Sequence, residues 1–536
     1  MTGSDRRPTP RSWPRLAFAL VVLVAAVVAV VLIARGSDHR SAGPGRSAVA
    51  SEASAAAAVG PEQAELSIGA RERVTPIPHS FLGFSTEYWT LPVDEHHLAL
   101  YRRVLSQIHV PGDGRFVLRI GGDSSDHAIW DPTSSRLPPW AFEVTPRLVA
   151  RTAKIVRQMR LRLIVDLNTL TSTPRIAGDW ARAAEAHLPA GSIIGFEIGN
   201  EPDLYSRSTW AHQLRHSGFN LARLPATITP SSYVGDYNRF ARALTRVAAG
   251  VPLLAPALAN PDRDRNWIST LLAGPHPGLR VISAHRYPYS ACSRPGRPQY
   301  PTVQKLLSEQ ATAGMARSVK PAVALARRAG LPVRMTEINS VTCGGVPGVS
   351  NSFATALWAP DALFELVRAG VQGVNLHVRV FSINAPFRFD RRGVRAWPLL
   401  YGLILFKRML GPDSRLVAVH LRSPRARRLK AWAVRVGADT LNVLLIDKGG
   451  RAVKVGLDLP ATGPAVVQRL LAPSASSRSR VTLAGQRLDD QVGWAGPARL
   501  QTVRPAAGRY SVSVRGQSAA LLTVHVAHTT LAGQPG

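Results

Sequence analysis

Cysteine is nearly absent from this sequence, and acidic residues are outnumbered. Only two of the 536 residues are cysteine, and neither lies near the N-terminus, which excludes a lipid-modified N-terminal cysteine. The sequence has 34 acidic and 66 basic residues, which gives a formal net charge of +32. Such an excess of basic residues can indicate an anionic partner. Most of the basic residues here are arginines that accompany abundant Ala, Gly, Pro and Val, as a GC-rich genome produces. The charge therefore supports an acidic substrate only weakly, and we expect no nucleic-acid partner.

One long apolar run stands out near the N-terminus. Residues 16–34 are apolar without interruption, and about 19 helical residues cross the hydrocarbon core of a bilayer. The positive-inside rule places the basic tail 1–15 in the cytoplasm, since it carries Arg6, Arg7, Arg11 and Arg15. We predict a single-pass plasma-membrane protein with its folded part outside and a flexible Ala/Ser/Gly-rich linker at 35–63. The alternative is a signal peptide cleaved near Ala48–Ala50, which gives a secreted protein.

From Leu66 onward, short apolar runs alternate with amphipathic helical segments, as in βαβ units around a parallel sheet. Eight runs are strand candidates: Phe81–Tyr88, Phe116–Gly121, Leu163–Asn168, Ile193–Asn200, Pro252–Ala257, Val281–Tyr287, Val333–Ile338 and Gly373–Val378. Helices are expected at His96–Gln107, Arg147–Met159, Tyr237–Ala249, Val319–Ala329, Phe353–Arg368 and Leu399–Leu410. Eight such units predict an α/β fold, a (β/α)8 barrel over residues 64–411.

After Gly411 the pattern changes to alternating strands and turns. The strand candidates are Leu429–Val436, Leu441–Ile446, Val453–Leu457, Tyr510–Val514 and Leu521–Val526. They predict a C-terminal β-sandwich over residues 412–528, with a tail at 529–536. The strand-like stretch Ala64–Ile68 is expected to pair into that sandwich.

Two carboxylates stand where barrel strands end, at the face that carries the chemistry of such barrels. The fourth strand ends in Asn200-Glu201-Pro202, and the seventh ends in Thr336-Glu337-Ile338. Carboxylates from strands four and seven face each other across the mouth, and a retaining glycosidase needs two carboxyl groups about 5 to 5.5 Å apart. The pair predicts a retaining glycoside hydrolase, against the plainer interpretation of two strand-end surface or salt-bridge residues.

Four segments resemble glycoside hydrolase family 79, which contains bacterial β-glucuronidases and animal heparanases. They are Phe84-Ser85-Thr86-Glu87, Leu118 to Asp123, Glu197 to Pro202, and Thr336-Glu337 with Ser352-Phe353-Ala354 and Leu357-Trp358. The resemblance covers roughly Ala64 to Ala527. It implies that Glu201 is the acid/base, that Glu337 is the nucleophile, and that Asn200 binds the sugar 2-hydroxyl.

Several neighbours of these carboxylates are further candidates for the site. By resemblance to the wider clan, Tyr287 would donate to the nucleophile, although it is as readily an aromatic lining of the pocket. Arg119 is equally interpreted as a cation that lowers the nucleophile's pKa or as a structural ion-pair partner. Glu197, four residues deeper than Glu201, is expected to be structural. Strand-end Glu87 and Asp123 are expected to touch substrate hydroxyls, and His285 to be a hydrogen-bonded wall rather than a metal ligand. No motif has metal-ligand spacing, so we expect neither metal nor cofactor.

The expected substrate is an acidic glycan or glucuronide from which a β-linked uronic acid is removed by double displacement through a glycosyl–Glu337 intermediate. Tyr287 or Tyr289 would then help to hold the substrate's carboxylate. The alternatives are a glycosidase of the same clan acting on neutral sugars (β-xylosidase, arabinofuranosidase or β-glucosidase) and a non-catalytic polysaccharide-binding protein on the same scaffold. Cys292 and Cys343 follow strands six and seven, which predicts a disulfide near the mouth in an oxidising compartment, against two free buried thiols.

Overall fold

The computed structural model describes residues 62–69, 72–133, 135, 137–206, 227–379, 381–424 and 428–526. The predicted basic tail, the membrane helix at 16–34, nearly all of the linker and the tail at 529–536 lie outside the described residues, and they stay predictions. Within the described part of the chain, no helix combines the length and the apolar character that crossing a bilayer requires.

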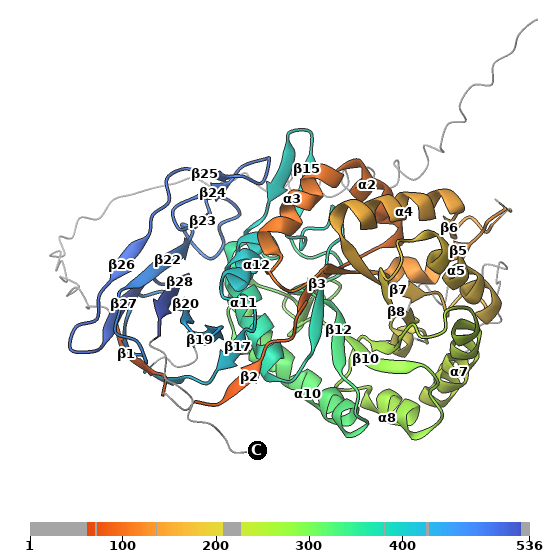
Figure 1. The fold of residues 1–536 in the computed structure, drawn as a ribbon, viewed down its shortest axis with the longest axis horizontal. Helices are drawn as coiled ribbons and strands as arrows, with labels where there is room; N and C mark the ends of the chain where they lie inside the picture. The colour runs from red at the N-terminus through yellow and green to blue at the C-terminus, as the bar shows by residue number, and fades with distance from the viewer. Residues whose placement is uncertain are drawn as a thin grey trace, which may run out of the picture. The chain divides into compact units, whose positions relative to one another are not determined.

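Eight parallel strands close into a barrel, in the order β10-β12-β14-β3-β4-β7-β8-β9 (Figure 1). Their bounds are β3 Leu82–Thr86, β4 Phe116–Ile120, β7 Leu161–Leu167, β8 Ile193–Ile198, β9 Leu253–Leu258, β10 Leu279–Arg286, β12 Val333–Ile338 and β14 Gly373–His377. All eight predicted strands are present, with ends that agree within two residues. Nearly all of their residues are buried, because helices cover the outside of the barrel and side chains fill the inside.

Helices connect the barrel strands: α2 Leu91–His96, α3 Leu98–Ile108, α4 Pro146–Met159, α5 Pro174–His187, α7 Pro230–Val247, α8 Arg265–Ala273, α9 Val303–Leu306, α10 Ala313–Arg328, α11 Phe353–Arg368 and α12 Pro398–Arg408. Several begin at a threonine followed by proline. The Thr145 side chain, for example, accepts from the N–H of Leu148, while the proline at the first helical position needs no acceptor. These caps determine where the helices start.

Three helix predictions are corrected by the structure. The helix expected at His96–Gln107 is two helices, α2 and α3, which are separated at His97, whose φ of −110° and ψ of 24° are not helical. Helix α7 begins seven residues before the predicted Tyr237, at Pro230, since a capping box of Thr229 and Ser232 starts it. Helix α10 begins at Ala313 and continues through Pro321, ahead of the predicted start at Val319.

The C-terminal β-domain consists of two main sheets, with strand orders β18-β1-β21-β27 and β2-β17-β19-β20-β28-β22-β23. The strands of the first sheet are β18 His420–Arg422, β1 Glu62–Ser67, β21 Val453–Asp458 and β27 Tyr510–Val514. Those of the second are β2 Val74–Pro76, β17 Arg415–Val417, β19 Leu429–Val436, β20 Thr440–Asp447, β28 Ser518–His525, β22 Ala465–Leu471 and β23 Thr482–Leu483, with β26 Gln501–Val503 beside β22. As expected, the N-terminal strand β1 pairs into this domain, in parallel with β21. Figure 1 shows the red β1 among the blue C-terminal strands and β2 beside the teal β17.

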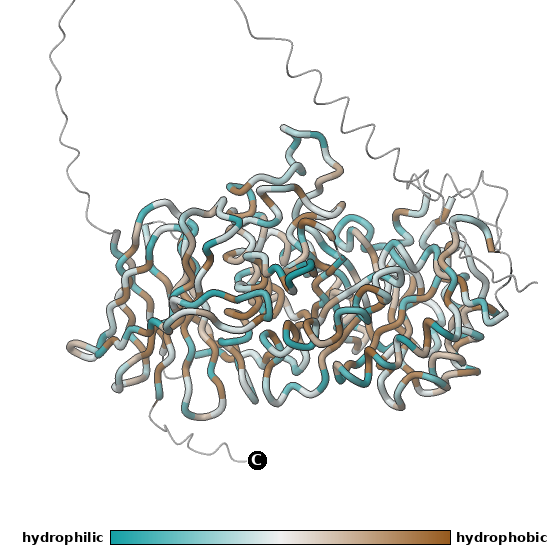
Figure 2. The backbone as a smooth tube through the Cα atoms, turned by 90° about the horizontal axis from the view of Figure 1, so that it is seen from above, coloured by the Kyte–Doolittle hydropathy of each residue, from teal (hydrophilic) through white to brown (hydrophobic). Residues whose placement is uncertain are grey.

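The barrel and the β-domain share a packed junction, and the described residues from 62 onward belong to one compact unit. Phe364 of α11 stacks on Trp432 of β19, with ring centroids 5.4 Å apart. The Trp432 indole N–H donates to Asp361 at 2.9 Å, and Asp361 also pairs with the buried Lys448. Apolar segments run through both halves of the tube in Figure 2. The β-domain is therefore a fixed support for the helix that follows β12.

Candidate active site

Glu201 is held in a left-handed backbone conformation just beyond β8. Its φ and ψ are 50° and 51°, and its N–H donates to the carbonyl of Ala257 at 3.1 Å. Gly199, with a φ of +86°, precedes it, and a Cβ there would lie 2.4 Å from the hydroxyl of Thr169. Such conformations cost of order 1 kcal/mol and occur at functional sites. The turn aims the Glu201 carboxylate, 20% exposed, into the barrel mouth.

Glu337, on β12, is the most tightly held carboxylate at this mouth. The Tyr287 hydroxyl donates to its Oε1 at 2.7 Å, and Nη1 of Arg119 donates to its Oε2 at 3.0 Å. Nδ1 of His377 lies 3.4 Å from the same Oε2. Burial alone would raise the pKa of Glu337, but His377, His285 when protonated, Arg119 and the Tyr287 hydroxyl together lower it to about 2. The side chain is an oriented anion at neutral pH.

Arg119, buried on β4, joins four strands beneath the mouth. Besides Glu337, its guanidinium donates to Glu197 at 2.5 Å, to Asp166 at 2.9 Å and to Asn200 Oδ1 at 3.1 Å. Removing one partner of such a buried network typically costs about 3–5 kcal/mol. Both interpretations of Arg119 therefore apply, because the same side chain is an ion-pair hub and a direct donor to Glu337. Glu197 lies in the interior with no exposed surface, as expected.

Asn200 is oriented by the same cation. Arginine only donates, so the oxygen of the Asn200 amide must face Arg119, and its NH2 group is directed elsewhere. The Asn200 backbone N–H donates to the hydroxyl of Tyr205 at 3.3 Å. The side chain, 4% exposed, thus presents a fixed donor next to Glu201.

Glu201 and Glu337 lie close together in opposite electrostatic settings. Oxygens of the two carboxyl groups, together with a ring nitrogen of His285, all lie within 4.8 Å of one another. Burial, and then the negative charge of Glu337, raise the pKa of Glu201 well above its ordinary value. Two carboxylates whose pKa values are driven apart provide one proton donor and one anion. This spacing fits the about 5 Å of retaining glycosidases and is shorter than the roughly 6.5–9.5 Å of inverting ones.

His285, at the end of β10, hydrogen-bonds to Glu201 through Nδ1 at 2.9 Å. Burial lowers the pKa of His285 to about 4, so the ring is neutral at physiological pH. A neutral imidazole can accept a hydrogen bond from a carboxylic acid or donate one to a carboxylate, according to its tautomer. His285 can therefore support Glu201 in both of its protonation states.

Glu201, His285 and Glu337 are also donor types that metals use. Both oxygens of Glu337 already accept hydrogen bonds, one from Tyr287 and one from Arg119. An ion at this point would lie beside the buried Arg119 guanidinium, which already pairs with Glu337, while Glu201 is hydrogen-bonded to His285. The donor set therefore fits proton transfer better than ion binding.

Glu87 and Asp123 lie at the same mouth but differ in access. Glu87 is fully buried, accepts from the N–H of Ser124 at 2.8 Å and lies 3.4 Å from Nε2 of His377. The side chain of Asp123 is 66% exposed and pairs with Arg379 at 3.3 Å. Asp123 is thus accessible to a bound sugar, whereas the buried Glu87 faces His377. Tyr289 faces away, since its hydroxyl bonds to Lys305 and Ser308.

His377, Asp166 and Arg379 were not predicted from the sequence. His377 lies between Glu87 and Glu337, and those two carboxylates raise its pKa although burial opposes them. It ends β14, so the rule that identified the other strand-end residues would have found it. Asp166 lies within β7, and only its pairing with Arg119 distinguishes it from other buried residues.

The predicted disulfide is present beside the mouth. Cys292 and Cys343 are bonded, with their Cα atoms 5.9 Å apart. The short strands β11 Tyr289–Ser290 and β13 Val341–Thr342 pair in parallel just before them and bring the two loops together. The bond therefore ties the loop after Glu337 to the loop after His285.

Comparison with known proteins agrees with this geometry. Residues 431–521 match the glycosyl hydrolase family 79 C-terminal beta domain. A β-glucuronidase of Aspergillus niger is 24% identical over 485 residues, which cover 80% of this chain and 86% of that protein. The chain is a glycoside hydrolase. Its resemblance to glycoside hydrolase family 79 is confirmed.

Solved structures show the same fold at low identity. A 4-O-α-L-rhamnosyl-β-D-glucuronidase of Fusarium oxysporum superposes with a TM-score of 0.68 at 18% identity, over 86% of this chain and all of the other. A family 51 α-L-arabinofuranosidase of Bifidobacterium longum gives 0.64 at 14% identity, over 87% of this chain and all of the other. The barrel with its β-domain is thus an architecture shared by enzymes of different sugar specificity.

Proposed function

We propose that this chain is a retaining β-glucuronidase-like hydrolase that removes a β-linked uronic acid by double displacement. The observation that carries the proposal is the pair Glu201 and Glu337, whose oxygens lie within 4.8 Å of each other while burial raises the pKa of one and cations lower the pKa of the other. A water held between the carboxylates of an inverting enzyme would need a wider gap.

In the first step, Glu337 Oε attacks the anomeric carbon and Glu201 protonates the departing glycosidic oxygen. Tyr287 and Arg119 keep the nucleophile ionised and aimed, because both donate to it. The NH2 of Asn200 is available to the sugar 2-hydroxyl, a contact that strengthens toward the transition state.

In the second step, Glu201 is ionised and accepts a proton from water, which attacks the glycosyl–Glu337 ester and releases the sugar with retained configuration. His285 then donates its Nδ1–H to Glu201. Glu337 leaves as the carboxylate that its surroundings favour.

The choice of a uronic acid rests on the resemblance to family 79 and on two relatives that are glucuronidases by name. Arg379 supports it, since this partly exposed cation lies at the mouth beside Asp123. An arginine there can pair with the carboxylate of the sugar, which must replace its water by other donors.

The test compares kcat/KM of the full chain, purified in detergent, for 4-nitrophenyl β-glucuronide, β-glucoside and β-xyloside at fixed ionic strength. We expect a strong preference for the glucuronide, of order 10⁴ in the most selective sites. Preference for a neutral sugar would support the same-clan alternative, while binding of polysaccharide without any hydrolysis would support a non-catalytic protein. Glu337→Gln is the internal control and should abolish turnover of every substrate.

We also propose that residues 16–34 hold the protein in the plasma membrane with its barrel outside. The motivation is the apolar run preceded by four arginines. Membranes washed with alkaline carbonate should retain the full-length chain, and protease added to intact protoplasts should digest it. Recovery of a shortened chain from the medium would show instead that the signal is cleaved.

A further inference from the structure

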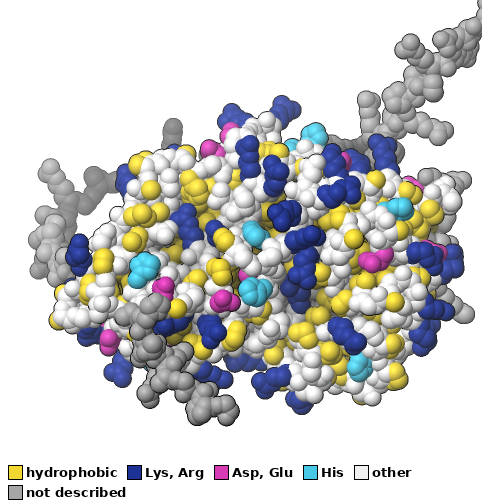
Figure 3. Space-filling model, viewed as in Figure 1, with side chains coloured by type: hydrophobic (Ala, Val, Ile, Leu, Met, Phe, Trp, Pro, Cys, Tyr) yellow, Lys and Arg dark blue, Asp and Glu magenta, His cyan; other side chains and the backbone are white. Residues whose placement is uncertain are grey.

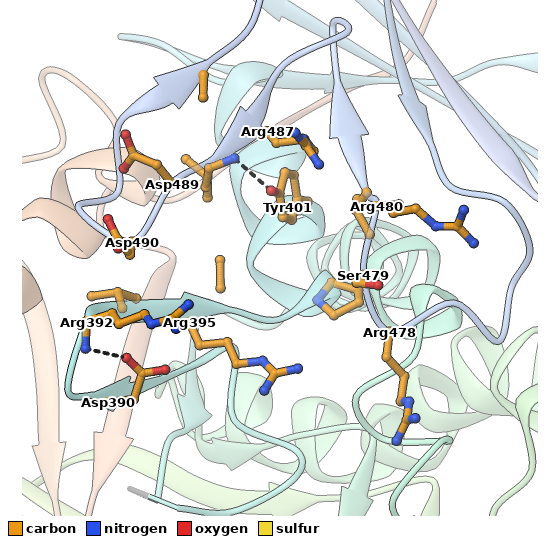
Figure 4. A pocket seen from close by; sticks show the side chains of 16 residues that line it. Asp390, Arg392, Arg395, Tyr401, Arg478, Ser479, Arg480, Arg487, Asp489 and Asp490 are labelled. Atoms are coloured by element: carbon orange, nitrogen blue, oxygen red, sulfur yellow. Dashed lines mark hydrogen bonds between the residues drawn. The ribbon is translucent and has the colours of Figure 1, made fainter.

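A second pocket, of about 530 Å³, lies outside the catalytic centre and is rich in arginine. One wall is the hairpin of β15 Phe387–Asp390 and β16 Gly393–Ala396; the other comprises residues 478–481 and the hairpin of β24 Arg487–Leu488 and β25 Trp494–Ala495. Figure 4 shows the two walls with Tyr401 of α12 between them. None of the lining residues belongs to the catalytic centre.

Five arginines line this pocket: Arg392, Arg395, Arg478, Arg480 and Arg487. Lys and Arg together make up 66 of the 536 residues, whereas arginine alone makes up five of the sixteen lining residues. The share of arginine in the pocket is therefore larger than the composition of the chain explains. Among the charged side chains on the face shown in Figure 3, Lys and Arg are far more common than Asp and Glu. Three aspartates also line the pocket, so five arginines minus three aspartates leave it a net charge of +2.

These arginines have no ion-pair partner among the described residues, although three aspartates share the lining. Two of the aspartates are engaged by the backbone instead. Asp390 accepts from the N–H of Arg392 at 2.9 Å, and Asp489 accepts from the N–H groups of Gln491 and Gly493 at 2.9 and 2.7 Å. The cations of the pocket are therefore available to an anion from outside.

The two walls are joined before any ligand arrives. The N–H of Val394 donates to the carbonyl of Asp490 at 2.7 Å, and the N–H of Leu488 donates to the Tyr401 hydroxyl at 2.8 Å. The guanidinium of Arg395 lies 4.5 Å from the centre of the Trp397 ring, which limits its freedom. A pocket with fixed walls loses little conformational entropy when a ligand binds in it.

We propose that this pocket is a second binding site, for an anionic polysaccharide whose carboxylate or sulfate groups pair with the arginines. Guanidinium groups bind both anions through paired N–H donors. A single small anion would leave most of the five cations unused, whereas a chain with regularly spaced charges would engage several. The β15–β16 hairpin belongs to the connection between β14, which carries His377, and α12, so the site is linked to the barrel mouth by one segment.

The test measures binding to the full chain in detergent, with Glu337→Gln present throughout so that no polymer is cleaved. The probes are hyaluronan, which carries only carboxylates, dextran sulfate, which carries only sulfates, and neutral dextran. Arg478→Ser/Arg480→Ser is compared with Arg327→Ser/Arg328→Ser, a matched pair of exposed arginines at the end of α10. Thermal unfolding of both variants checks that they fold.

We expect the Kd for at least one charged polymer to rise about tenfold in Arg478→Ser/Arg480→Ser, as two partly exposed charge pairs are lost, and to change less than about twofold in the control. An effect on hyaluronan alone assigns carboxylate, and an effect on dextran sulfate alone assigns sulfate. Equal losses of affinity in both double variants would mean that the polymers bind by general attraction to the net charge, and would overturn the proposal. Equal affinity for neutral dextran would also overturn it, as would unchanged affinity in both double variants. Because no turnover is measured, these outcomes are independent of the proposed glucuronidase activity.

Discussion

The hydroxyl of Tyr287 donates a 2.7 Å hydrogen bond to Oε1 of Glu337. Burial raises the pKa of Tyr287 well above its ordinary value, so the phenol keeps its proton at neutral pH and remains a donor. Glu337 in turn is ionised, since its pKa is lowered to about 2. The bond therefore stabilises the charged form of Glu337, the proposed nucleophile.

Replacing Tyr287 by Phe should raise the pKa of Glu337, because a donor to the carboxylate form is lost. The acidic limb of the pH profile of kcat/KM, which requires ionised Glu337, should move to higher pH, and the maximum should fall by roughly tenfold to a hundredfold. Steady-state kinetics with 4-nitrophenyl β-glucuronide from pH 3 to 8 measure both effects. An unchanged acidic limb would mean that Tyr287 only lines the pocket.

Replacing Glu201 by Gln should affect substrates according to their leaving groups. For alkyl glucuronides, which need a proton on the departing oxygen, hydrolysis should fall by roughly 10²–10⁴-fold. A 2,4-dinitrophenyl glucuronide needs no such help, so its first step should survive as a rapid burst followed by slow release of the sugar. Stopped-flow absorbance resolves the burst. Equal losses for both substrates would remove Glu201 from the acid role.

Asp94 on α2 should make stability depend on pH. It is 3% exposed, and burial raises its pKa to about 7 despite a hydrogen bond from Thr90. A group with a raised folded-state pKa contributes stability below the unfolded value of about 4, and loses it as the pH rises through about 7. Asp94→Asn, which resembles the protonated acid, should therefore gain roughly 2–3 kcal/mol over wild type between pH 5 and pH 8.

Denaturant unfolding of wild type and Asp94→Asn at the two pH values measures this gain. Asp458→Asn, at an exposed position on β21, is the matched control for the loss of one carboxylate charge. If Asp94→Asn were no more stabilising at pH 8 than at pH 5, the carboxyl would not be protonated in the folded protein.

The disulfide should stabilise the folded protein mainly by restricting the conformations of the unfolded chain. Cys292 and Cys343 are 51 residues apart, and closing a loop of that length contributes about 4 kcal/mol in the chain-entropy model. Cys292→Ser/Cys343→Ser should lose that amount in denaturant unfolding under non-reducing conditions. Titration of the unreduced, denatured wild type should find no free thiol, and two thiols per chain would contradict the bond.

The positions of the barrel strands followed from the sequence, because buried parallel strands are continuous apolar runs with helical segments between them. The polar residues at the ends of β8 and β12 were evident for the same reason. Asn200 and Glu201 follow one apolar run, and Glu337 interrupts another. Helix starts were less predictable. The buried face of α7 already begins at Tyr233, but Pro230, Ser231, Ser232 and Gly235 around it are residues that also form loops.

The sequence by itself therefore determined the barrel, the β-domain and the two carboxylates, since these depend on local periodicity and on where strands end. Only the tertiary structure decided how those carboxylates differ. Arg119 contacts Asp166, Glu197 and Glu337 from three other strands, and His377 lies between Glu87 and Glu337. These groups are distant in the chain, and closing the barrel brings them together. A pKa depends on the charges, donors and burial around a group. The proposed roles of Glu201 as acid and Glu337 as nucleophile therefore rest on contacts that exist only once the eight strands have closed into the barrel.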